Sequence, residues 1–353
     1  MTNKRLVTLD CNIYGLQQYG GISNYLSVLL SFISHDHELI AELVLPQNIS
    51  YKAFDSNWLK ICKVVYEFMP PKISQYFCAS PLTVGDTFHS PYYRLPGRGV
   101  SNYIVTVYDF TYERFRKGLP RLIHTYVKAR SISRADNLIC ISEATKSDLL
   151  EFFPWVDQSK IHVIYLGVDH KMYYPDKENF AGIDISNTVL FVGQRKGYKR
   201  FDLAIDAIRL CPNLTLGIVG PKLGSEEKKY LNQQLDSRWF EIGLIDSNHL
   251  RKLYSSAYAL IFPSEYEGFG LPILEAMACG CPVIASQIPV FKEIGADCAM
   301  YSLEQNSASY SNLLVLLEYG MPCRDKVIKN GLIRAKKYQW EDMYQKTKAL
   351  YLV

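Results

Sequence analysis

Residues Pro263–Ser286 read P-S-E-Y-E-G-F-G-L-P-I-L-E-A-M-A-C-G-C-P-V-I-A-S, which is the order of a loop, a helix and a strand. An apolar strand ends at Phe262, and two glycines make a flexible turn after it. Pro272 stands where the helix begins, a position at which the missing N–H loses no hydrogen bond. Gly280 ends the helix, and the apolar run after it predicts the next strand. This order is typical of an α/β protein.

The glycine turn also suits a phosphate, because free N–H groups and the positive end of a helix dipole meet there. Two carboxylates flank the turn, Glu267 before it and Glu275 in the first part of the helix. Carboxylates repel phosphate, so we expect them to hold sugar hydroxyls instead. The alternative is a turn without a ligand, in which the glutamate only complements the helix dipole.

The spacing of the two glutamates carries a resemblance to a known family. Seven residues separate Glu267 from Glu275, and the stretch is similar to the E-x7-E signature of retaining family 4 glycosyltransferases. The resemblance implies the GT-B architecture, two Rossmann-like βαβ domains that face each other across a cleft. It also implies that Glu267 holds the donor sugar and Glu275 the ribose. The turn that would contact the donor consists of Gly268, Phe269, Gly270 and Leu271.

A stretch near the N-terminus resembles the same family. Residues 17–24 read Q-Q-Y-G-G-I-S-N and stand before a helix with an apolar period. Gly20 and Gly21 allow the backbone to approach an anion closely. The resemblance implies that this loop meets the donor phosphate, whereas an ordinary turn is the alternative.

Residues 192–199, V-G-Q-R-K-G-Y-K, match a further motif of the family. Arg195 and Lys199 precede a helix, where cations are unfavourable for the helix dipole unless an anion is bound. Simple exposure to solvent is the alternative. The resemblance implies that the pair neutralises the donor diphosphate, and that Gly220 and Pro221 border the donor after the next strand.

Residues 103–109, Y-I-V-T-V-Y-D, predict a buried strand with a polar end. Active residues of doubly wound folds gather at such carboxyl ends, so we expect Asp109 in the active site. The family usually carries His-Asp here, and this chain carries Tyr108 before the aspartate. Whether Tyr108, or His89 on a loop after the preceding strand, replaces that histidine stays open. Both residues also fit a purely structural role.

The length of 353 residues favours two domains. We predict an N-terminal acceptor domain at 1–168, a linker at 169–187 and a nucleotide-sugar donor domain at 188–338. The last segment, 339–353, is expected to be a helix that crosses back to the N-terminal domain. The net charge of +4 and the absence of a nucleic-acid motif argue against a nucleic-acid partner. Nine cysteines without zinc spacing indicate a reducing compartment and no structural metal.

The segment Glu113–Arg134 is a basic amphipathic stretch. It carries seven Lys or Arg residues against one acid, and apolar residues interleave with them at helical spacing. Such a helix can lie on anionic lipid. The alternative is an outer helix whose apolar stripe packs on the sheet. We see no signal peptide and no apolar run of bilayer length, so we expect a cytoplasmic protein, with peripheral membrane association left open.

Together these features predict a retaining hexosyltransferase for O-antigen, capsule or other surface polysaccharide synthesis. The donor is a nucleotide-diphosphate sugar, with GDP-mannose favoured over a UDP-sugar, and the acceptor is a glycan or lipid-linked saccharide. No cofactor and no metal are expected, since two cations can stabilise the leaving diphosphate and no Asp-x-Asp occurs. A sugar-nucleotide epimerase of the same fold and a non-catalytic nucleotide-sugar-binding homologue are the alternatives. Linkage and oligomeric state are not determined by the sequence.

Overall fold

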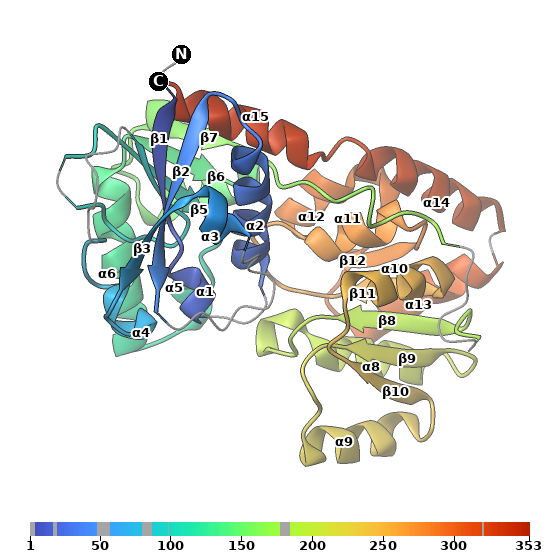
Figure 1. Cartoon of the computed structure of the whole chain (residues 1–353). Coiled ribbons are helices and arrows are strands. Elements are labelled where there is room, and N and C mark those ends of the chain that lie inside the picture. The colour runs from blue at the N-terminus through green and yellow to red at the C-terminus, as the bar shows by residue number, and fades with distance from the viewer. Residues whose placement is uncertain are drawn as a thin grey trace. The chain divides into compact units, whose positions relative to one another are not determined.

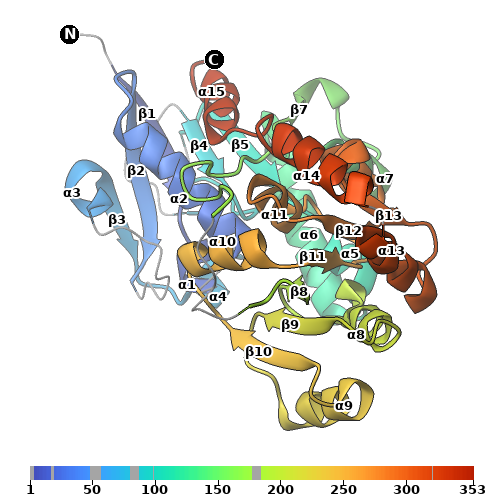
Figure 2. The same cartoon turned by 90° about the vertical axis from the view of Figure 1, so that its right-hand side faces the viewer.

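The structure is a computed structural model that describes residues 4–16, 20–47, 57–79, 87–97, 99–176, 184–319 and 321–353. It contains two compact units, the first made of residues 1–166 with 340–353 and the second of residues 167–339. Every pairing between neighbouring described strands is parallel, and both sheets carry helices (Figures 1 and 2). The predicted α/β class with two Rossmann-like domains is confirmed. The stretch predicted as a linker begins inside the second unit, and residues 177–183 of it lie outside the described part.

The first unit is a sheet with the strand order β3-β2-β1-β4-β5-β6-β7. The chain proceeds outward from β1 in one direction and from β4 in the other. Right-handed crossovers therefore place α2 and α6 on opposite faces, as Figure 1 shows. The strands are β1 Arg5–Asp10, β2 Leu39–Pro46, β3 Lys63–Glu67, β4 Thr87–Ser90, β5 Asn102–Val107, β6 Asn137–Cys140 and β7 Ile161–Val163. The helices are α1 Ile13–Leu16, α2 Gly21–Ser34, α3 Trp58–Ile61, α4 Pro71–Ser74, α5 Thr111–Phe115, α6 Leu119–Arg134, α7 Glu143–Phe152 and α15 Trp340–Tyr351.

The last helix, α15, belongs to the first unit and packs beside α2. Tyr344 stacks on Phe32 with ring centres 4.9 Å apart. Lys348 pairs with Asp36 at 2.7 Å and with Glu38 at 2.6 Å. The C-terminal helix thus completes the hydrophobic and ionic surroundings of α2.

The second unit is a sheet with the order β10-β9-β8-β11-β12-β13. Helices α10 and α11 lie on one face, and α8 and α13 lie on the other (Figures 1 and 2). The strands are β8 Thr188–Val192, β9 Thr215–Val219, β10 Trp239–Gly243, β11 Ala259–Phe262, β12 Val283–Ser286 and β13 Met300–Ser302. The helices are α8 Phe201–Arg209, α9 Ser225–Leu235, α10 Ser247–Ser256, α11 Leu271–Ala278, α12 Pro289–Gly295, α13 Ser307–Tyr319 and α14 Met321–Ala335.

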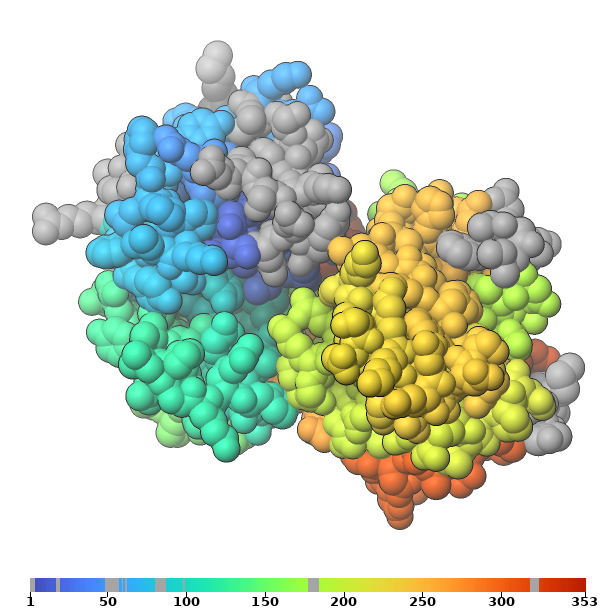
Figure 3. Space-filling model, turned by 90° about the horizontal axis from the view of Figure 1, so that it is seen from below, coloured from blue at the N-terminus to red at the C-terminus, as the bar shows by residue number. Residues whose placement is uncertain are grey.

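The basic stretch 113–134 differs from its prediction in two ways. It is divided between α5 and α6 at Gly118, whose φ of +70° lies in a region that favours glycine. Most apolar residues in the first half of α6 also face outward, with Leu119 and Leu122 exposed by 67% and 66%, whereas Ile132 near its end is buried. The alternative in which this stripe packs on the sheet is therefore wrong for these residues. Figure 3 shows this segment (teal) side by side with residues 57–79 (blue).

Candidate active site

Two loops of the second unit leave the sheet at its centre. Strands β8 and β11 are neighbours, and from them the chain proceeds toward opposite edges of the sheet. Open α/β sheets bind ligands beyond the carboxyl ends of the strands at such a switch point. The loop after β8 carries Arg195 and Lys199, and the loop after β11 carries Glu267. The topology thus brings together the motifs at 192–199 and 263–275.

Lys199 and Glu267 form an ion pair between these loops. Their side chains are 16% and 15% exposed, so the pair is shielded but reachable from solvent. The Lys199 ammonium also lies 5.3 Å from the centre of the Phe262 ring and 5.5 Å from that of Tyr198. Both rings attract a cation through their negative faces. The lysine is therefore held at the end of β11.

The turn before α11 leaves the first turn of this helix without a side-chain cap. Gly270 has a φ of +117°, and α11 begins at Leu271. Since the N-cap residue is glycine, the first N–H groups of the helix receive no side-chain acceptor from it. The Phe269 side chain is buried, with its ring 6.1 Å from that of Tyr338. Only the backbone at 268–270, and not the Phe269 ring, suits contact with a ligand.

Glu275 lies inside α11, and its carboxylate faces two tyrosines. The Tyr254 hydroxyl donates to Glu275 Oε2 at 3.5 Å. Burial raises the pKa of Glu275, and hydrogen bonds from Tyr173 and Tyr254 lower it. Burial has the larger effect, so the resulting pKa is about 7. A carboxyl group with this pKa changes its charge near neutral pH. When it is ionised, both of its oxygens accept hydrogen bonds from hydroxyl groups, and when it is protonated, one of them carries a donor.

Arg195 contacts the loop that follows β9 and the start of α9. Its Nε donates to Glu227 Oε1 at 2.7 Å, and its Nη1 donates to the Pro221 carbonyl at 2.8 Å. Hydrogen bonding from Arg195 holds the pKa of Glu227 below its usual range. Gly220 has a φ of +155°, and a Cβ there would lie 2.4 Å from the Gly193 carbonyl oxygen. The loops after β8 and β9 are thus locked together beside the predicted diphosphate position.

In the first unit, Gly20 and Gly21 stand at the start of α2. The Gly20 carbonyl accepts from the Asn24 N–H at 3.1 Å. A Cβ added at Gly21 would meet no described atom within 4 Å. The backbone is therefore open on this side, as contact with an anion requires. The rest of the predicted loop, residues 17–19, lies outside the described part.

Asp109 follows β5 and is half-buried. Its Oδ1 accepts from the Thr111 N–H at 2.9 Å, and its carbonyl accepts from Lys128 Nζ at 2.9 Å. The aspartate is thus fixed in place at the carboxyl end of the sheet.

His89 was expected on a loop, but it lies within β4 and is buried. Its Nδ1 meets the Tyr351 hydroxyl at 2.6 Å, and its Nε2 meets the Thr106 hydroxyl at 2.7 Å. Burial lowers the pKa of His89 to about 3. Tyr108 is also buried, with its ring edge-on to Tyr25. Since both His89 nitrogens have partners inside the unit, this histidine serves the core and does not supply an active-site imidazole.

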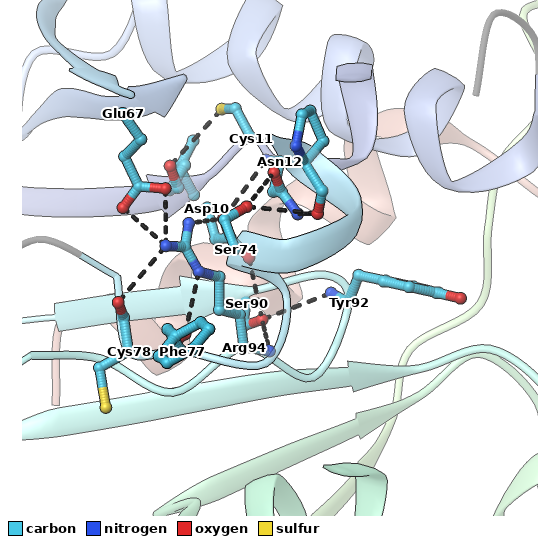
Figure 4. Close-up of polar contacts among 12 residues, drawn as sticks. Asp10, Cys11, Asn12, Glu67, Ser74, Phe77, Cys78, Ser90, Tyr92 and Arg94 are labelled. Atoms are coloured by element: carbon cyan, nitrogen blue, oxygen red, sulfur yellow. Dashed lines mark hydrogen bonds and ion pairs between the residues drawn. The ribbon is translucent and has the colours of Figure 1, made fainter. Parts of the chain in front are cut away.

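A buried ionic cluster escaped the sequence reasoning (Figure 4). Arg94, 2% exposed, donates to a Glu67 carboxylate oxygen at 2.6 Å and to Asp10 Oδ1 at 3.4 Å. It also donates to the backbone carbonyls of Phe77 and Cys78. The cluster fills the switch point of the first sheet, between β1 and β4. An aspartate at the end of an apolar strand, Asp10, was a sequence signal for such a buried cluster. The partners of Asp10 come from distant parts of the chain, so the sequence did not reveal them.

Residues 176–331 match the model of a family described as "Glycosyl transferases group 1", and residues 77–171 match that of "Glycosyltransferase Family 4". The chain carries both of these glycosyltransferase domains. The O-antigen chain mannosyltransferase RfbU of Salmonella typhimurium is 28% identical over 62% of this chain and 61% of its own length. The chain spans about half to three fifths of the length of the curated relatives it matches.

Two solved structures have a similar fold. Sucrose-phosphate synthase from Thermosynechococcus elongatus has a TM-score of 0.77 and 19% identity, over 99% of this chain and 98% of that one. HepE of Anabaena, solved in complex with UDP, has a TM-score of 0.75 and 17% identity, over 99% of this chain and 100% of that one. At this level of identity the likeness shows the fold alone.

Proposed function

We propose that the protein is a hexosyltransferase that moves a hexose from a nucleotide-diphosphate sugar to a glycan or lipid-linked acceptor in surface polysaccharide synthesis. The observation that carries the proposal is the Lys199–Glu267 pair at the switch point of the second sheet. The pair places a cation that can bind phosphate next to a carboxylate that can accept hydrogen bonds from sugar hydroxyls. RfbU, a relative, is named an O-antigen chain mannosyltransferase, which favours GDP-mannose. HepE was solved with UDP, which keeps a UDP-sugar as the next candidate.

In this proposal the second unit binds the donor and activates its leaving group. Lys199, Arg195 and the first N–H groups of α11 stabilise the charge that develops on the diphosphate as the bond to the sugar breaks. Glu267 leaves its pairing with Lys199 and accepts hydrogen bonds from the sugar hydroxyls. Glu275 accepts from the ribose, and Gly220 and Pro221 border the nucleotide.

The acceptor belongs to the first unit, with Asp109 as the carboxylate that receives the hydrogen bond of the attacking hydroxyl. Gly20 and Gly21 supply the anion-binding backbone of the first unit. We expect retention at the anomeric carbon, by attack on the face from which the diphosphate leaves and without a covalent intermediate. No cofactor is proposed. Since the cations named above do the work of charge stabilisation, we expect activity to be the same with EDTA as without it.

We further propose that the protein acts in the cytoplasm, with its first unit on an anionic membrane surface. The outward face of α6 is apolar and carries Arg121, while the neighbouring segment exposes Phe68 and Met69. Each basic residue near an anionic bilayer contributes about 1 kcal/mol. Among the described helices, none has the length and apolar character needed to cross a membrane. Sedimentation with vesicles tests the idea: we expect binding to phosphatidylglycerol vesicles and none to phosphatidylcholine vesicles, and equal binding to both would contradict an electrostatic contribution.

The central test is a thermal-shift panel of GDP, UDP, ADP, dTDP and CMP with their common sugar conjugates. A ligand at 100 times its dissociation constant adds about 2.7 kcal/mol to the free energy of unfolding. One clear responder identifies the base and gives the donor for a transfer assay. Products then separate the candidates: a new sugar nucleotide without acceptor indicates an epimerase, and binding without turnover indicates a non-catalytic homologue.

A further inference from the structure

A pocket of about 330 Å³ lies in the first unit, beyond the carboxyl ends of β4 and β5. Aromatic side chains make one wall: Tyr92 and Tyr93 follow β4, Tyr112 is in α5 and His124 is in α6. Tyr112 stacks on His124 with ring centres 4.0 Å apart and planes within 9°. Tyr92 and Tyr93 are edge-on to the same imidazole, with ring centres 6.2 and 6.0 Å from its centre. The rings fix one another, so the wall is preorganised.

The rest of the lining comes from α6 and from the residues that follow α4. Leu119, Ile123 and Val127 contribute apolar surface, and Gln75 and Tyr76 contribute polar atoms. Leu119 and Ile123 are also among the exposed apolar residues of α6. The pocket therefore opens on the face that we assign to the membrane surface.

A buried network connects the aromatic wall to Asp109. His124 Nδ1 lies 3.4 Å from Glu113 Oε1, and Lys128 Nζ lies 2.8 Å from Glu113 Oε2. Lys128 in turn donates to the Asp109 carbonyl at 2.9 Å. Burial by itself raises the pKa of Glu113, but His124 and Lys128 outweigh burial and lower it to about 2. The pocket is thus anchored to the turn that carries the candidate catalytic carboxylate.

The lining of the pocket favours a neutral ligand with both apolar and hydroxylic surface. Apart from His124, the described side chains that line it carry no ionisable acid or base other than phenols. A diphosphate would find no cation there. A sugar ring can place its C–H face on an aromatic ring and its hydroxyls on phenol, imidazole or amide groups. The volume lies at the lower end for small-molecule sites, which fits one ring better than a larger ligand.

We propose that this pocket holds a neutral hexopyranose ring of the acceptor, next to Asp109. The assignment rests on the proposed transferase function and specifies where its acceptor sugar is recognised. The ring is bound through the Tyr112–His124 stack, while any lipid attached to the saccharide lies along the exposed face of α6.

The test is saturation-transfer NMR on the full chain with methyl α-mannopyranoside, methyl α-glucopyranoside and methyl α-galactopyranoside as probes, and geraniol as a lipid-chain probe. We expect at least one glycoside to bind. Tyr112→Ala should weaken that binding at least tenfold and Tyr112→Phe by less, while Tyr66→Ala, an exposed tyrosine outside the pocket, should leave it unchanged. The nucleotide response of the thermal-shift panel should be the same in all three variants. That response shows that they are folded and tests the transferase proposal separately.

Three results would overturn the assignment. One is that no glycoside binds. Another is that binding survives Tyr112→Ala but is lost in Glu267→Ala, since the sugar then occupies the donor site of the second unit. The third is that geraniol alone binds in a manner that depends on Tyr112, which would make the pocket a site for a lipid chain.

Discussion

Lys199 and Glu267 stand 68 positions apart in the sequence, and the fold joins them in an ion pair at the ends of β8 and β11. Without a donor, each charge is neutralised by the other. A bound diphosphate competes for the lysine, and sugar hydroxyls compete for the carboxylate. The pair thus keeps both groups in position and keeps the unliganded site from holding an unpaired charge, which is costly when shielded from water.

Replacing Glu267 should separate chemistry from nucleotide binding. Glu267→Ala is expected to lower turnover by at least about 100-fold, because the sugar hydroxyls lose an acceptor that is aligned for the transition state. Nucleoside diphosphate binding should stay the same or become slightly tighter, since Lys199 is released from its partner. Turnover and calorimetric titration with the responding nucleotide give the two numbers. Unchanged turnover would remove Glu267 from the mechanism.

Replacing Lys199 should have the opposite effect on binding. Lys199→Ala is expected to weaken nucleoside diphosphate binding by about 1.5–3 kcal/mol, the range for a hydrogen bond to a charged group. Lys196→Ala is the matched control, because it removes an equal charge from an exposed position in the same loop. Calorimetric titration of both variants with the nucleoside diphosphate measures the two losses of affinity. If the two losses are equal, the effect is one of net charge and not of a contact at Lys199.

Arg195 should behave differently from Lys199, because it also supports the protein. Arg195→Ala is expected to weaken diphosphate binding by about 1.5–3 kcal/mol and to lower the melting temperature as well. The reason is that the guanidinium donates to Glu227 and to the Pro221 carbonyl. Thermal melts without nucleotide, compared with those of Lys199→Ala, measure the second effect. Equal nucleotide affinity in the wild type and the variant would contradict the phosphate role.

Much of the second unit could be predicted because the residues that begin and end its helices and strands lie within those elements or next to them in the sequence. Helix α11 starts one residue before the expected Pro272, and strand β12 follows Gly280 as expected. In such places a glycine, a proline or a capping residue determines where an element ends. The two loops with the candidate residues follow directly from these ends, so the sequence also predicted that Lys199 lies before a helix and Glu267 in the turn after a strand.

The errors have physical reasons as well. The periodicity of α6 indicates an apolar stripe, but it does not say whether that stripe faces the sheet or the solvent. His89 was expected on a loop after the strand, whereas β4 continues to Ser90. The Arg94 cluster depends on Asp10, 84 positions away. A pairing of that kind arises from the topology and leaves no local pattern.

The pKa of Glu275 makes a prediction about stability and pH. A carboxyl group whose pKa is raised on folding, here from 4.5 to about 7, binds its proton more tightly in the folded state. Its contribution to stability is complete below pH 4.5 and is lost as the pH rises through 7. Between pH 5 and pH 8 the wild type should lose about 2–3 kcal/mol relative to Glu275→Gln, which has no such titration. Denaturant unfolding of both proteins at the two pH values measures the difference. A difference that does not depend on pH would mean that Glu275 is ionised throughout.

Two glycines near the proposed diphosphate position should respond differently to alanine. Gly220 combines a φ of +155° with a predicted Cβ contact of 2.4 Å to the Gly193 carbonyl oxygen. Gly220→Ala therefore requires a backbone shift, and we expect it to cost about 1–3 kcal/mol of stability and to weaken nucleotide binding by displacing Arg195. Gly197→Ala is the control in the same region, because its Cβ would meet no described atom within 4 Å. Thermal melts and nucleotide titrations of the two variants should separate clearly. If both are neutral, the close approach of the β8 and β9 loops does not position the site.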